Sequence, residues 1–343
     1  MPDGLAPAPR EHGWTGVLLA LAAFLLLPPT APFSAVLPVV DTAVLLVPML
    51  AACFLVGWRS GGRLSLAAMW VALAAWLLSA PWGMGRAGQP GGVAYHDLTA
   101  AWALLTAGMF GVVSLMAPER RLFARALSAV GLALLAAVVL LLLAEQRPES
   151  AQHVFVTQFA RRYEQTRALL ETPSMRTAMS QNVALREQFQ QSLRDMQSLS
   201  RFAAPLYPAL LALQSLATCA LAWSLYHRLS RARIGPPLAA LRQFRFNDQL
   251  IWGLVLGLVI ALLPTLAPLR ALGFNLLLLF GVLYALRGLG VIAWALPRGR
   301  GAARTVAIMT AAFVVLLTSG VAVVGVGIFD TWLNWRERPR PTS

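Results

Sequence analysis

Long runs of apolar residues recur along this chain, and they constrain its fold more than any other feature. Leu122–Ala144 and Thr305–Phe329 are two of them. Each run matches the roughly 20 apolar residues that a helix needs to cross a bilayer. Backbone amides inside lipid must be hydrogen-bonded within their own segment, so each run is expected to be helical. The chain is therefore predicted to be an all-α, polytopic transmembrane bundle.

We predict about nine membrane-spanning helices, and the charge content agrees. Only 12% of the residues are charged, whereas an ordinary soluble domain has about 25%. The spans are expected at residues 14–27, 35–58, 64–80, 98–117, 122–144, 204–226, 250–267, 271–296 and 305–329. They divide the chain into a transmembrane region (1–144), a hydrophilic insert (145–201), a second transmembrane region (202–335) with a cytoplasmic loop at 227–249, and a polar tail (336–343).

Arginines in the short loops predict the orientation. The net charge of +14 comes from arginine alone, and Arg59, Arg63, Arg120 and Arg121 lie between apolar runs. The positive-inside rule places such loops in the cytoplasm. We therefore expect a bacterial inner-membrane protein with a cytoplasmic N-terminus and an extracytoplasmic insert. Nine spans would leave the arginine-rich tail outside, although its charge favours the inside, so the side of the C-terminus stays open.

The insert at 145–201 is predicted to be a small helical hairpin. Thr172-Pro173 is typical of an N-cap followed by proline in the first helical turn. After it, apolar residues recur every three to four positions, which indicates an amphipathic helix. This stripe could pack on itself, on the bilayer surface or on a partner, and we favour the first. Its members are Leu185, Phe189, Leu193, Met196 and Leu199.

Polar side chains inside the spans are candidate functional groups because they are costly in lipid. Asp41 and Arg287 are such candidates, but both could instead be charges near a membrane interface. Asn275 is expected to hydrogen-bond between helices rather than to bind a substrate. On the first span, Gly16 and Ala20 form a pair of small residues that would let another helix approach closely.

The segment Arg231–Trp252 is the most distinctive cytoplasmic stretch, because aromatic and aliphatic residues alternate there with arginines. It is predicted to lie in the headgroup layer with its arginines on lipid phosphates, or to dock a partner protein. The candidate contact residues are Arg242, Phe244, Arg245 and Trp252, with Asp330 and Trp332 near the end of the last span.

No pattern of catalytic, cofactor-binding or metal-binding residues is evident. Cys53 and Cys219 lie in apolar segments, and the four histidines are far apart in the sequence. We see no nucleophile with its base, no paired carboxylates and no Walker loop. Arginines placed in loops between spans also argue against nucleic acid as a partner. We therefore predict a protein that is not an enzyme, takes no cofactor or metal, and has no ATPase of its own.

Three parts of the carboxyl half resemble the YybS-like family of bacterial multi-pass membrane proteins, those with domain of unknown function 2232. They are Gly235–Pro237 with Arg242–Arg245 and Leu250–Trp252; Asn275-Leu276 with Leu283-Tyr284 and Gly288-Leu289; and Gly327–Asp330 with Trp332 and Arg336. The likeness is strongest over residues 231–336. Asn247 stands where relatives often have proline, and Arg287 where glutamine is expected. The resemblance implies a membrane bundle and names no reaction.

The layout is also similar, at the level of the fold, to the substrate-binding S components of energy-coupling-factor vitamin transporters. We therefore favour a protein that binds or helps to transport a small molecule, with partners such as ATPase proteins supplying energy. The competing hypothesis is a membrane scaffold that acts through the insert 145–201 and the segment 231–252. A polar cavity near Asp41 or Asn275 would favour transport, and a solid bundle would favour a scaffold.

Overall fold

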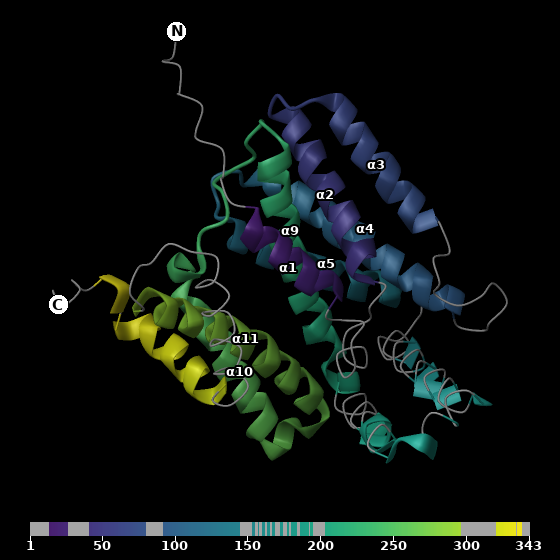
Figure 1. Cartoon of the computed structure of the whole chain (residues 1–343). Coiled ribbons are helices and arrows are strands. Elements are labelled where there is room, and N and C mark those ends of the chain that lie inside the picture. The colour runs from purple at the N-terminus through teal and green to yellow at the C-terminus, as the bar shows by residue number, and fades with distance from the viewer. Residues whose placement is uncertain are drawn as a thin grey trace, which may run out of the picture. The chain divides into compact units, whose positions relative to one another are not determined.

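The computed structural model describes residues 14–26, 41–79, 92–144, 203–295, 320–333 and 335–337, and part of 153–194. None of these residues is in a β-strand, which confirms the all-α fold (Figure 1). Among the described residues, five helices are long and apolar enough to cross a membrane, and four shorter apolar helices accompany them. Each of these helices overlaps a predicted span, and residues 305–319 of the last predicted span lie outside the described residues.

The chain divides into two compact units. Unit 1 comprises Met1–Pro205 and Gln214–Pro237, and unit 2 comprises Leu206–Leu213 and Leu238–Ser343. The boundary falls within helix α9 (Tyr207–Leu229). The first turns of α9 therefore belong to unit 2, and the rest of the helix belongs to unit 1.

Unit 1 is built around α2. The helix α2 packs against both α3 and α4, and α4 packs against α5 (Figure 1). Phe110, Trp223 and Tyr226 are fully buried in the core of this unit. Gly57 lets α9 come close to α2, because a Cβ there would overlap the Tyr226 hydroxyl. The helices of this unit are α1 (Thr15–Leu26), α2 (Asp41–Arg59), α3 (Leu64–Ser79), α4 (Gly92–Met116), α5 (Leu122–Leu143) and most of α9.

Unit 2 contains a tightly packed helix pair, α10 (Ile251–Leu262) and α11 (Arg270–Ala295), joined through the 3-10 turn η5 (Pro264–Leu269). Glycine lets the two helices approach closely. A Cβ on Gly273 would lie only 2.9 Å from the backbone nitrogen of Ala261. Small residues at a helix contact are typical of bundles in membranes, where close packing drives association.

The helix Gly320–Leu333 also crosses α11 at a pair of glycines. A Cβ on Gly288 would strike the carbonyl oxygen of Val323, and a Cβ on Gly327 would strike that of Tyr284. The backbones of the two helices therefore touch at this crossing, which leaves no room for any other residue type.

In the hydrophilic insert, most of the described positions are helical. Thr172 is not helical and Pro173 is, as the N-cap pattern predicts. Phe189 and Leu193 are half-buried while most of their described neighbours are exposed, as expected for an amphipathic helix. The other members of the predicted stripe, Leu185, Met196 and Leu199, lie outside the described residues.

Candidate functional site

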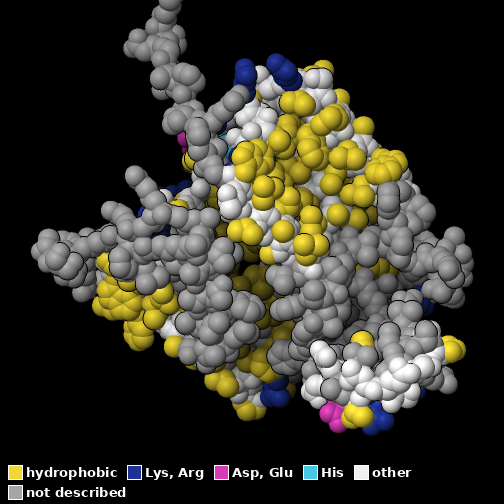
Figure 2. Space-filling model, viewed as in Figure 1, with side chains coloured by type: hydrophobic (Ala, Val, Ile, Leu, Met, Phe, Trp, Pro, Cys, Tyr) yellow, Lys and Arg dark blue, Asp and Glu magenta, His cyan; other side chains and the backbone are white. Residues whose placement is uncertain are grey.

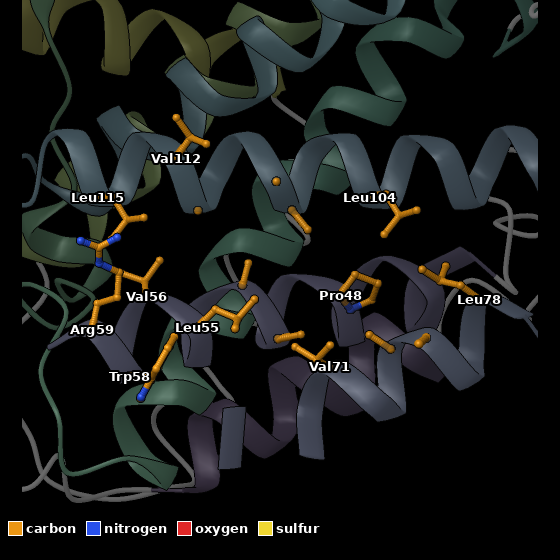
Figure 3. Close-up of a pocket in the computed structure, with 17 residues that line it drawn as sticks. Pro48, Leu55, Val56, Trp58, Arg59, Val71, Leu78, Leu104, Val112 and Leu115 are labelled. Atoms are coloured by element: carbon orange, nitrogen blue, oxygen red, sulfur yellow. The ribbon is translucent and has the colours of Figure 1, made fainter. Parts of the chain in front are cut away.

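An apolar groove of about 520 Å³ lies between α2, α3 and α4 (Figure 3). Its walls are mainly alanine, glycine, proline and aliphatic side chains, and Arg59 is the one charged residue among the described residues that line it. Its volume lies within the roughly 300–1,000 Å³ of typical small-molecule sites. Since the walls offer few hydrogen-bonding groups, a polar solute would lose its hydration there without compensation. The groove is therefore suited to an apolar molecule or chain.

Small residues on α4 open this groove. A Cβ on Gly108 would meet no atom within 4 Å, and a Cβ on Gly111 would meet only the Cβ of Ala52, at 3.9 Å. Both glycines line the groove. Larger side chains at these positions would project into space that is now open.

Arg59 ends the groove on one side. Figure 3 shows its guanidinium beside Leu115, with Pro48 and Leu104 further along the groove. Arg59 is exposed, and it has no hydrogen-bond or ion-pair partner among the described residues. Among the described residues, the groove thus joins an apolar interior to one exposed positive charge.

A buried cluster of charged residues lies in unit 2, beside the second half of α11. The Oδ2 atom of Asp330 accepts hydrogen bonds from Arg287 Nε at 3.0 Å and from Arg336 Nη2 at 2.6 Å. Arg287 Nη1 also pairs with Asp248 Oδ1 at 2.6 Å. The Asp330 side chain is 0% exposed and that of Asp248 is 55% exposed. Two guanidinium groups therefore neutralise one fully buried carboxylate.

Aromatic side chains and a loop backbone complete this cluster. Arg287 lies over the ring of Phe246 at 5.4 Å, and that ring meets Tyr284 edge-on at 5.1 Å. Arg336 Nη1 donates to the carbonyl oxygen of Phe244 at 2.8 Å. The cluster thereby ties the loop before α10 to α11 and to the end of the last helix. All three parts of the chain that carry the family resemblance contribute to this cluster.

Unit 1 has a buried arginine of a different kind. Arg125 is 0% exposed, and it donates to backbone carbonyls, including Ile234 O at 3.0 Å and Arg120 O at 2.8 Å. Its guanidinium lies 4.9 Å from the centre of the Trp223 ring. Gly235 adopts φ +149°, and a Cβ there would strike Arg125. These contacts fix the chain that leaves α9, which gives Arg125 a structural role.

The intramembrane candidates have different surroundings. Asn275 Oδ1 accepts from the backbone nitrogen of Ala209 at 2.9 Å, and its Nδ2 donates to Ala271 O at 2.8 Å. It thus satisfies a free amide at the start of α9, as a group that links helices would. Asp41 begins α2, but its side chain lies outside the described residues. Arg287 is buried and ion-paired with Asp330 and Asp248.

The candidate contact residues are only partly on the surface. Arg242, Trp252 and Trp332 are exposed, while Phe244 and Arg245 are partly buried. Asp330 is buried in its ion pairs, so its side chain is not presented to lipid or to a partner. On α1, Gly16 is exposed and Ala20 is half-buried. A Cβ on Gly16 would meet no described atom within 4 Å, so this small-residue pair has no close helix contact at that glycine.

Several residues of these sites were missed from the sequence. Arg125 lies within a predicted span, so the rule that singled out Arg287 applied to it equally. Ala107 and Gly111 stand four residues apart on α4, a small-residue spacing that marks a close helix approach or an open groove. In the sequence, Arg59 indicated only that the loop after it is cytoplasmic. Its place at the end of the groove depends on packing that sequence spacing does not reveal.

Comparison with known proteins identifies a family. The profile of a family described as predicted membrane protein (DUF2232) matches residues 20–331. This range covers the groove and reaches Asp330 in the buried cluster. No curated protein and no solved structure matches the chain.

Proposed function

Given that the chain belongs to the DUF2232 family of predicted membrane proteins, we propose that it binds a small hydrophobic or amphipathic molecule from the bilayer. The observation that carries this proposal is the apolar groove between α2, α3 and α4. Its volume suits a small-molecule ligand, and its walls favour one that is largely apolar. If the protein also helps to move this ligand, partner proteins supply the energy, because the sequence contains no Walker loop.

Filling the groove tests this proposal. The variant Gly108→Leu places a side chain where a Cβ meets no atom within 4 Å, and we expect this side chain to fill the groove that Gly108 lines. Gly131→Leu is the matched control, because Gly131 on α5 is also open and does not line the groove. The full chain is purified from gently solubilised membranes, and mass spectrometry identifies the molecules that it retains. We expect a stoichiometric hydrophobic molecule in the wild type and control, and its loss from Gly108→Leu.

A scaffold function is the second candidate, and an exposed segment supports it. Leu238, Leu241 and Arg242 are exposed in the loop between α9 and α10, where apolar and basic groups would suit a protein partner. The same purification tests it through the proteins that are recovered. Stoichiometric recovery of membrane-assembly proteins with the wild type, Gly108→Leu and Gly131→Leu, and with no retained small molecule, would favour this function over ligand binding.

A further inference from the structure

We infer that the occupant of the groove is an anionic phospholipid, with an acyl chain between α2 and α4 and its phosphate at Arg59. This inference rests on the proposed function, because it names the class of ligand for the same site. Three features of the groove carry it: its length, the residues at its charged end, and the surface around it.

The groove has the length of one lipid monolayer. Along α2 it extends from Pro48 to Arg59, and along α4 from Leu104 to Leu115. At about 1.5 Å per helical residue, each wall is about 17 Å long. The hydrocarbon core of a bilayer is about 30 Å thick, so one leaflet contributes about half of that. A chain that starts at Arg59 therefore ends near Pro48, at the depth where the acyl chains of one leaflet end.

The charged end of the groove has the residues of a membrane interface. Trp58 precedes Arg59 and is 46% exposed, and tryptophan is enriched at the level of the headgroups. Arg120 and Arg121 follow α4 at this same end and are exposed, with Glu119 beside them as the one acidic residue of that loop. The arginines outnumber this acid, so the local charge attracts an anionic headgroup.

The surface around the groove is apolar and can face lipid. Figure 2 shows a broad hydrophobic area over the part of unit 1 that contains α2, α3 and α4, with arginine side chains at the end where α2 connects to α3. Leu55, Leu104 and Leu115 line the groove and are each more than 40% exposed. A lipid of the surrounding leaflet would therefore reach the groove from the side.

Photoreactive lipids test the inference. The full chain is placed in nanodiscs of equal parts phosphatidylglycerol and phosphatidylcholine, with a trace of one lipid that carries a diazirine on an acyl chain. Either the anionic or the neutral lipid carries the label, and cross-linked peptides are mapped by mass spectrometry. We expect cross-links on the groove-lining parts of α2 and α4, in higher yield for phosphatidylglycerol.

Substitution of Arg59 isolates the role of the phosphate. In Arg59→Gln, the preference for phosphatidylglycerol should fall about fivefold, which corresponds to the attraction of one arginine to an anionic membrane surface. Arg59→Lys should keep most of the preference because it keeps the charge. Arg63→Gln is the matched control, since Arg63 is exposed in the turn that follows α2 and does not line the groove.

The outcomes separate the two proposals. Equal labelling by both lipids in the wild type, or an unchanged preference in Arg59→Gln, would overturn the anionic ligand. If Gly108→Leu still abolished labelling in that case, the groove would bind a hydrophobic chain and the proposed function would stand. Labelling of the groove that persists in Gly108→Leu would overturn both.

Discussion

Arg287 and Asp330 form a buried ion pair, with Arg287 Nε 3.0 Å from Asp330 Oδ2, although 43 residues separate them in the sequence. Arg287 also donates through Nη2 to the carbonyl oxygen of Asp330, at 3.3 Å. A lone charge in either helix would be costly in lipid or in a protein core. The ion pair explains how α11 and the last helix can each carry a buried charged residue. It also fixes the register of these two helices at the glycine crossing beside it.

Removing the shared carboxylate should destabilise unit 2 strongly. In Asp330→Asn, Arg336 loses its ion-pair partner among the described residues, and Arg287 keeps only the half-exposed Asp248. Breaking a buried pair in this way costs about 3–5 kcal/mol. The melting temperature in detergent, measured by intrinsic fluorescence, should fall accordingly. Asp248→Asn is the control, because that side chain is 55% exposed and its ion pair is screened by solvent. Similar losses in the two variants would contradict a special role for Asp330.

The glycine crossing gives a second prediction. Gly288→Ala should separate α11 from the last helix, because its Cβ would meet the Val323 carbonyl oxygen. Overpacking of this kind costs about 1–3 kcal/mol. Gly281→Ala on the same helix should be neutral or slightly stabilising, since its Cβ meets nothing within 4 Å and alanine favours helix. The two variants are compared by their resistance to unfolding in a series of sodium dodecyl sulfate concentrations. Equal resistance would contradict close backbone contact at Gly288.

The segment that follows α9 should become more mobile when Arg125 is replaced. Arg125→Gln removes the charged donors to Ile234 O and Arg120 O, each bond to a charged group being worth about 1.5–3 kcal/mol. We expect faster proteolytic cleavage after Arg231 and Arg233 in inverted membrane vesicles. Arg228→Gln is the comparison, because Arg228 donates to Ser224 O within its own helix. Unchanged cleavage in Arg125→Gln would mean that other contacts hold this segment.

The predicted orientation is open to a cysteine test. Cys53 and Cys219 are both 0% exposed, so the native chain should give little background with a membrane-impermeant maleimide. In intact cells without their outer membrane, Glu187→Cys in the insert should react, because Glu187 is exposed and the insert is predicted to be extracytoplasmic. Arg63→Cys should react only after the membrane is permeabilised. Reaction of both variants in intact cells would reject the predicted topology.

The sequence by itself determined the helical, membrane-embedded architecture. Lipid offers no hydrogen bonds to the backbone, so a long apolar run has to be helical wherever it crosses. Local chemistry likewise set the helix start at Pro173, because proline is compatible with the first turn and with few other places in a helix. The family could also be recognised from the sequence alone. Each of the motifs in the carboxyl half that resemble the family is made of residues close together in the chain.

Only the tertiary structure decided which residues meet. The ion-pair partners of Arg287 and the Ala209 amide that Asn275 binds lie outside α11. The hydrophobicity of each span is the same whichever neighbour it packs against. Likewise the groove ending at Arg59 depends on three helices meeting with glycines turned toward the space between them. The physical reason is that local residue pattern determines whether a segment enters the membrane, whereas steric fit and charge pairing between distant segments determine how the segments assemble.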